Sequence, residues 1–148
     1  MCIMVYLACD GQLPTFDWNS EAPDFYVTEL KETDYGYKQV RSILTKKYLY
    51  NIGAHSGCGC GFNYGTYELF DEVDRQEDIK GRNSVNKLLQ YIENSLQNNE
   101  CVELLTCLAG NEGISPIKSE IYLDQIILGD SFNFRSENEL RFINGRKS

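Results

Sequence analysis

The sequence predicts an α+β protein, in which a mixed β-sheet of five to six strands is packed by two main helices. Two observations support this fold class. Apolar segments at 2–9, 48–52 and 101–108 are typical of strands that are buried on both faces. Between them lie two segments whose apolar residues recur at helical spacing. A three-layer α/β arrangement is the nearest alternative.

The first half of the chain is expected to hold three strands and one short helix. Residues 2–9 form a strand that ends at the turn residues Asp10 and Gly11. Residues 25–30 form a second strand, and a helix begins at Asp34 and ends near two lysines, whose charge suits the negative end of the helix dipole. The third strand spans 48–52.

The second half is expected to begin with an acidic stretch at 68–78, which is interpreted as a solvated loop or helix face, with ion binding as the alternative. A helix is predicted over 84–97, because Val85, Leu88 and Ile92 form one apolar stripe. The fourth strand follows, and residues 121–128 are ambiguous between helix and strand. Alternation at 132–134 and 140–142 predicts a terminal hairpin.

Length and charge limit the classes of function. A chain of 148 residues is expected to form a single domain, 1–148. Its net charge of −8 argues against binding to nucleic acid and to anionic membrane surfaces. No apolar run approaches the roughly 18 residues of a membrane helix. The expected location is therefore the cytoplasm, where the six cysteines stay reduced and serve as buried apolar residues, ligands or reactive thiols.

The segment 53–62 concentrates the residues that carry chemistry. It holds four of the twelve glycines, two of the six cysteines and the one histidine, directly after the third predicted strand. Glycines allow tight turns, and alternating glycines can expose main-chain N–H groups to an anion or phosphate. Gly57, Gly59 and Gly61 are thus the candidate residues for binding a cofactor.

Parallel pairing of strands 2–9, 48–52 and 101–108 would bring their carboxyl ends to one sheet edge, where sites gather. The candidate metal ligands on that edge are His55, Cys58, Cys60, Cys9 and Cys107. Cys2 and Cys101 would then lie at the opposite edge and belong to the core.

Three functions remain open for this loop. The preferred one is ligand binding, with metal first: one imidazole and two thiols suit zinc or an iron–sulfur cluster, and Cys9, Cys107, a carboxylate or water would complete the set. The second is a thiol enzyme, in which Cys58 or Cys60 acts with His55 in redox or acyl-transfer chemistry. Asp10 or Glu112 would orient the imidazole.

The third function is a structural loop in a non-catalytic interaction module. Its partner would be a small molecule or a protein, and a homo-oligomer is compatible with this interpretation. The cysteines would then pack as small apolar side chains.

The loop resembles that of an uncharacterised family of small bacterial proteins, which share a strand followed by a His-x-Gly-Cys-Gly-Cys-Gly-Phe loop. The segments at 1–7, 25–27 and 102–105, with Pro14 and Trp18, fit the same resemblance. The family has no established function, so the resemblance implies only where to look. It points to the hallmark residues His55, Gly57, Cys58, Gly59, Cys60, Gly61 and Phe62.

Overall fold

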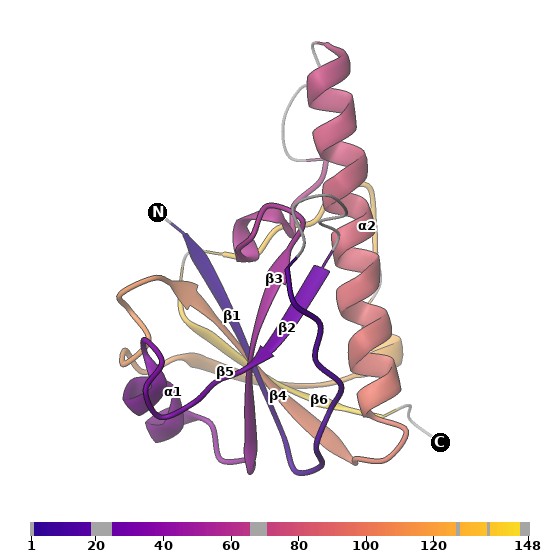
Figure 1. Ribbon diagram of the computed structural model, residues 1–148. Helices are drawn as coiled ribbons and strands as arrows, with labels where there is room; N and C mark the ends of the chain where they lie inside the picture. The colour runs from indigo at the N-terminus through magenta and orange to yellow at the C-terminus, as the bar shows by residue number, and fades with distance from the viewer. Residues whose placement is uncertain (1, 19–24, 66–70, 127, 136, 146–148) are drawn as a thin grey trace.

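The computed structural model describes residues 2–18, 25–65, 71–126, 128–135 and 137–145. The mixed sheet of six strands and the two α-helices confirm the predicted α+β class (Figure 1). The strands are β1 (Ile3–Cys9), β2 (Phe25–Glu29), β3 (Tyr48–Ala54), β4 (Cys101–Leu108), β5 (Ile117–Tyr122) and β6 (Glu139–Asn144). The helices are α1 (Tyr37–Ile43) and α2 (Glu72–Ser95), with short 3-10 turns η1 (Gly59–Gly61) and η2 (Leu123–Gln125).

The order of strands in the sheet is β2-β3-β1-β4-β6-β5. The expected parallel pairing of the first strands is wrong, because β1 lies between β3 and β4 and runs antiparallel to both. The β2–β3 pair is also antiparallel, and among the strands that the structure describes β5 and β6 alone pair in parallel. As a result, the first residues of β1 lie at the same end of the sheet as the last residues of β3 and β4.

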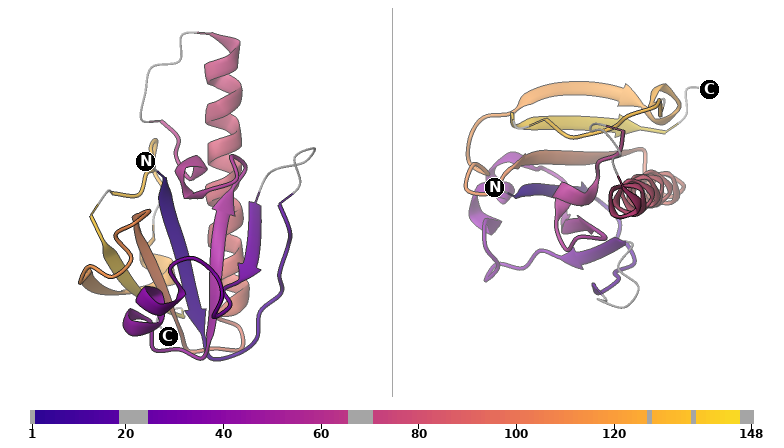
Figure 2. Two further views of the ribbon diagram at one scale, coloured as in Figure 1. Left: turned by 60° about the vertical axis from the view of Figure 1, so that its left-hand side comes forward. Right: turned by 90° about the horizontal axis from the view of Figure 1, so that it is seen from above.

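The two helices cover opposite faces of the sheet (Figure 2). Alternate side chains of β1 enter different cores: Val5 and Leu7 pack with residues of α2, whereas Tyr6 packs with Val40 of α1. This alternation is the two-residue period of a strand. It explains why 2–9 is apolar throughout.

Helix α2 is longer than the apolar stripe predicts. It begins at Glu72, after Asp71, whose side chain accepts a hydrogen bond from the Asp74 backbone N–H as an N-cap. The apolar Val73 in its first turn is 70 % exposed, and the N-terminal turns extend beyond the sheet (Figure 1).

In the described part of the acidic stretch, Glu72 and Glu77 are exposed on a solvated helix face, whereas Asp78 is buried and accepts the Gly65 N–H at 2.7 Å. Residues 68–70 lie outside the described residues.

Two other expectations are corrected. Helix α1 begins at Tyr37, because the Asp34 carboxylate accepts the Lys31 N–H in a preceding turn and does not cap the helix. The terminal hairpin is wrong: Phe132 makes an isolated bridge with Tyr64, and β6 pairs with β4 and β5. The ambiguous segment at 121–128 contains the end of β5 and η2.

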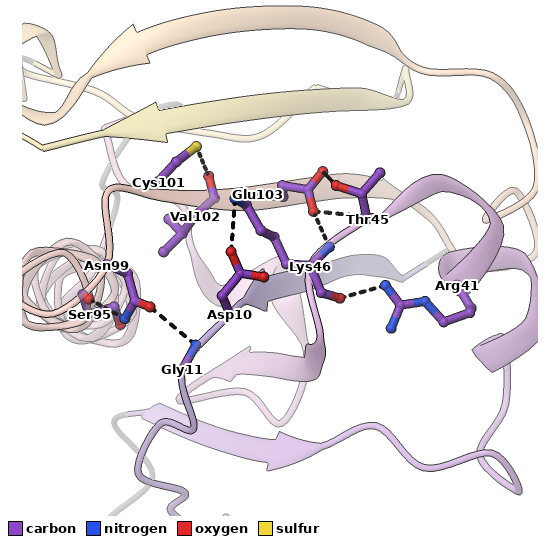
Figure 3. A network of polar contacts seen from close by, with 10 residues as sticks. All are labelled: Asp10, Gly11, Arg41, Thr45, Lys46, Ser95, Asn99, Cys101, Val102 and Glu103. Atoms are coloured by element: carbon purple, nitrogen blue, oxygen red, sulfur yellow. Dashed lines mark hydrogen bonds and ion pairs between the residues drawn. The ribbon is translucent and has the colours of Figure 1, made fainter.

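A polar network holds the end of the sheet where β1 finishes (Figure 3). The buried carboxylate of Glu103 accepts the backbone N–H groups of Thr45 and Lys46, both at 2.8 Å, and the Thr45 hydroxyl at 3.1 Å. The Lys46 ammonium lies 3.2 Å from the Asp10 carboxylate. These contacts join β1, β4 and the loop before β3, so the sheet is fixed at the end opposite to the glycine–cysteine loop.

Candidate functional site

A tight turn at the end of β3 positions the two cysteines of the loop. The Gly57 N–H donates to the Ala54 carbonyl, and the Ala54 N–H donates to the Cys58 carbonyl, both at 3.0 Å. Gly57 has a φ of 88°, the left-handed region that favours glycine. The chain thus reverses immediately after β3 and continues into η1.

The loop then packs on the beginning of β1. A Cβ at Gly59 would lie 2.6 Å from the Ile3 carbonyl oxygen, so only glycine allows this approach. At the same contact the Ile3 N–H donates to Cys60 Sγ at 3.1 Å. Cys2, the residue before Ile3, is therefore brought next to the loop.

Cys2, Cys58 and Cys60 form a cluster of three thiols. Their sulfur atoms all lie within 4.8 Å of one another. Cys2 is exposed and the other two are partly buried, and all three are free cysteines. Among the residues that the structure describes, this is the group whose His, Cys, Asp or Glu side chains come close enough to share one ion. We refer to it as the cysteine cluster.

The pKa values of Cys58 and Cys60 are shifted in opposite directions. Burial acts to raise the pKa of Cys58, but the Cys60 backbone N–H and the side chains of Cys60, Ser56 and Cys2 donate to its sulfur and together lower that pKa. The pKa of Cys60 is raised, mainly by burial and also by the neighbouring Cys58, although the Ile3 N–H acts to lower it. Cys58 therefore becomes a thiolate more readily than Cys60.

His55 points to α2 and not to the cysteine cluster. Its Nε2 lies 3.2 Å from the Glu77 carboxylate, and its Nδ1 lies 3.0 Å from Ser84 Oγ. A carboxylate can only accept a hydrogen bond, so the proton in the contact with Glu77 is on Nε2. Ser84 Oγ accepts the His55 backbone N–H, and its own hydroxyl proton can be donated to Nδ1 of a neutral ring. The histidine thus fastens the loop to the helix.

The structure does not bring the other predicted ligands to the cluster. Cys9 pairs with Tyr48, at the opposite end of β3, because β1 is antiparallel. Cys107 lies at the correct end of β4, but it is fully buried in the core on the α1 face. Burial raises the pKa of Cys107 to about 12, with Glu112 adding to the effect, so this thiol stays protonated.

The candidate acids and glycines are also placed elsewhere than expected. Asp10 pairs with Lys46 in the distant network, and the Glu112 carboxylate accepts from the Tyr6 hydroxyl and the Gly110 N–H. Gly59 and Gly61 are buried, and a Cβ at Gly61 would lie 2.7 Å from both Ala54 Cβ and Ser56 Oγ. These two glycines permit close packing, while Gly57 is exposed.

The sequence does not identify Cys2 as a site residue, because parallel strands predict that it lies at the opposite edge of the sheet, whereas the structure places it in the cluster. The sequence of an apolar strand does not show in which direction the strand runs. Either end of 2–9, with Cys2 or with Cys9, could therefore lie beside the loop.

Two aromatic residues beside the loop donate hydrogen bonds to its backbone. The Tyr26 hydroxyl donates to the Gly57 carbonyl at 2.8 Å, and Trp18 Nε1 donates to the His55 carbonyl at 3.3 Å.

The chain matches no protein-family model, and neither the curated proteins nor the solved structures contain a match to it. The geometry of the cysteine cluster is therefore the observation that bears on function. Within the described residues, no helix has both the length and the apolar character needed to cross a membrane.

Proposed function

We propose that the protein binds a soft metal ion, with zinc as the first candidate, through the thiolates of Cys2, Cys58 and Cys60. The observation that carries this proposal is the approach of the three sulfur atoms to within 4.8 Å of one another. Thiolate sulfur is the donor that zinc, copper(I) and iron–sulfur clusters prefer. Both chain segments that supply the sulfurs are held by main-chain hydrogen bonds, so the site is largely formed in advance.

The spacing favours a single ion over a cluster. A Zn–S bond of about 2.3 Å in tetrahedral geometry places the sulfurs about 3.8 Å apart. Closing the observed spacing to that value requires shifts of at most about 1 Å. Iron–sulfur clusters are instead held by four cysteines around a larger core. Three protein sulfurs leave one position of a tetrahedral zinc ion for water or an external ligand.

The electrostatics of the cluster support the same conclusion. Metal binding requires deprotonated cysteines, and an N–H group that donates to sulfur stabilises the thiolate form. The Ile3 N–H donates to Cys60 Sγ, and the Cys60 N–H donates to Cys58 Sγ, which has a lowered pKa. These amides act as outer-shell groups that orient and stabilise the ligands.

The test is the metal content of protein purified without an affinity tag. We expect near-stoichiometric zinc in the wild type, and its loss in each of Cys2→Ser, Cys58→Ser and Cys60→Ser. Cys101→Ser is the matched control, because Cys101 is also a partly buried free cysteine but lies at the start of β4. Retention of the metal in Cys2→Ser, or its loss in the control, would contradict the assignment.

A second candidate function is reversible thiol oxidation, which the lowered pKa of Cys58 favours. The Cys58 thiolate would attack a peroxide, breaking the O–O bond and forming a sulfenic acid with release of water or an alcohol. The Cys60 thiol would then condense with it, forming a disulfide and a second water. Pairing of Cys58 with His55 is not part of this proposal, because both ring nitrogens contact α2.

Thiol titration of the same sample separates the candidates. Metal-free protein with one fast thiol at Cys58 supports the oxidation chemistry, whereas slow thiols throughout support a structural loop in an interaction module. Metal binding and thiol oxidation both require reduced cysteines. We therefore propose a cytoplasmic location, because cysteines are kept reduced in that compartment.

A further inference from the structure

The β5 strand forms one outer edge of the sheet, and it pairs only with β6 among the described strands. The Ile117 N–H donates to the Asn138 carbonyl at 2.9 Å, and Ile117 is opposite Glu139 in the parallel register. Backbone groups alternate in direction along a strand. The N–H and C=O groups of Lys118 and Glu120 therefore point away from β6, toward the open edge.

The residues of this strand are arranged so that an antiparallel copy centred on Ser119 would place opposite charges across from each other. The sequence reads Ile117-Lys118-Ser119-Glu120-Ile121, with an isoleucine at each end and opposite charges on either side of the serine. All of these side chains are exposed except that of Ile121, which is partly buried. Ile117 is 64 % exposed, a large value for an apolar residue within a strand.

We propose that β5 is the interface of a homodimer, in which two copies pair antiparallel about a two-fold axis at Ser119. In this register Lys118 lies opposite Glu120 of the second copy, and Ile117 lies opposite Ile121 of the second copy. The two outward-pointing residues become hydrogen-bonded pairs, which is the geometry their backbone groups already have. The six-stranded sheet then continues across both copies.

Charge complementarity selects this register over its neighbours. A shift of two residues one way places Lys118 opposite Lys118, and a shift the other way places Glu120 opposite Glu120. Like charges directly opposite each other destabilise an antiparallel pair, and opposite charges stabilise it. Charged residues on an edge strand usually prevent pairing, so the complementary arrangement also limits association to this one geometry.

Measuring molar mass against protein concentration, with reductant and a metal chelator present, tests the proposal. We expect a reversible dimer in the wild type, and a dissociation constant raised at least tenfold by Lys118→Glu or by Glu120→Lys. The double variant Lys118→Glu/Glu120→Lys restores opposite charges in each pair and is expected to recover the dimer. Circular dichroism checks that Glu120→Lys folds without the contact between Asn144 and Glu120.

Two results would overturn the proposal: a wild type that stays monomeric at millimolar concentration, or single variants that dimerise as well as the wild type. A cross-link tests the axis directly. Cα atoms in a non-hydrogen-bonded antiparallel pair lie about 4.5 Å apart, within the range of a disulfide. Ser119→Cys is thus expected to form a covalent dimer on mild oxidation, beyond the wild-type background.

Tyr122→Cys is the control for that cross-link, because Tyr122 is exposed on the same strand and makes none of the proposed cross-strand pairs. Its equivalents are offset by six residues in this register, which places their Cα atoms on the order of 20 Å apart, too far for a disulfide. Equal cross-linking of both variants, or none in Ser119→Cys, would contradict the two-fold axis at Ser119.

Discussion

The ring of Tyr26 occupies the space beside Gly53 that a side chain at position 53 would need. The two residues are opposite each other in the β2–β3 register, and a Cβ built on Gly53 would overlap the Tyr26 ring. The Tyr26 hydroxyl then reaches the Gly57 carbonyl in the cysteine loop. The absence of a side chain at Gly53 therefore allows the Tyr26 ring to take the position from which it supports the cysteine loop.

Gly53→Ala is expected to destabilise the protein by about 1–3 kcal/mol, because the added methyl group displaces the Tyr26 ring. Urea denaturation measures the change in the free energy of unfolding. Gly129→Ala is the control, since a Cβ at Gly129 would meet nothing within 4 Å. Similar losses in both variants would contradict the steric explanation.

Glu103→Ala is expected to reduce stability by about 3 kcal/mol or more. The substitution leaves the Thr45 and Lys46 backbone N–H groups without their buried acceptor, and hydrogen bonds to charged groups are the stronger ones. Glu103→Gln keeps one acceptor oxygen and should cost less. The urea midpoints of the two variants check this order, and a midpoint for Glu103→Ala equal to that of the wild type would refute the role of the network.

Cys58 is expected to react with iodoacetamide at lower pH than Cys101. Alkylation follows the thiolate fraction, which persists to lower pH when the pKa is lowered, as for Cys58. Burial raises the pKa of Cys101, so its reaction should appear only at higher pH. Peptide mapping by mass spectrometry after brief labelling gives the order. Labelling of Cys101 first would reverse the assignment.

Glu77→Gln is expected to reduce stability by less than about 1 kcal/mol at neutral pH, since the carboxylate is half exposed. The hydrogen bond from His55 lowers the pKa of Glu77. Its contribution is therefore present above the usual glutamate range and is lost as the pH falls through the lowered value.

The difference between wild type and Glu77→Gln in urea denaturation should thus shrink as the pH falls below the usual glutamate pKa of about 4.3. Glu72→Gln is the control on the same helix, because Glu72 contacts Gln76 and Arg75 and not the histidine. A difference that does not change with pH would argue against the His55–Glu77 contact.

The sequence was sufficient to locate most strands but not to direct them. Residues 101–108 coincide with β4, and 48–52 falls within β3, because continuous apolar segments require burial on both faces. Such segments look the same in both directions, so the assumed parallel β1 placed Cys9 at the site and Cys2 away from it. The antiparallel register exchanges these two cysteines.

Two of the remaining differences, in α2 and in β5, arise where side chains contact solvent. The stripe at Val85, Leu88 and Ile92 reports only the half of α2 that packs on the sheet, and the exposed turns from Glu72 carry no such pattern. Strand β5 is polar and exposed, so it lacked the apolar signal of a strand. Phe132 and Phe134 alternate because they pack in the aromatic core, where their rings are 5.1 Å apart.

The cysteine cluster joins two parts of the chain that are far apart in sequence, as the 57-residue separation of Ile3 and Cys60 illustrates. An ion shared by their sulfurs would act as a cross-link that the unfolded chain lacks. By mass action, each tenfold rise in free metal above the dissociation constant would add about 1.4 kcal/mol to the stability of the fold. The melting temperature of the protein would then depend on the free metal concentration of its surroundings.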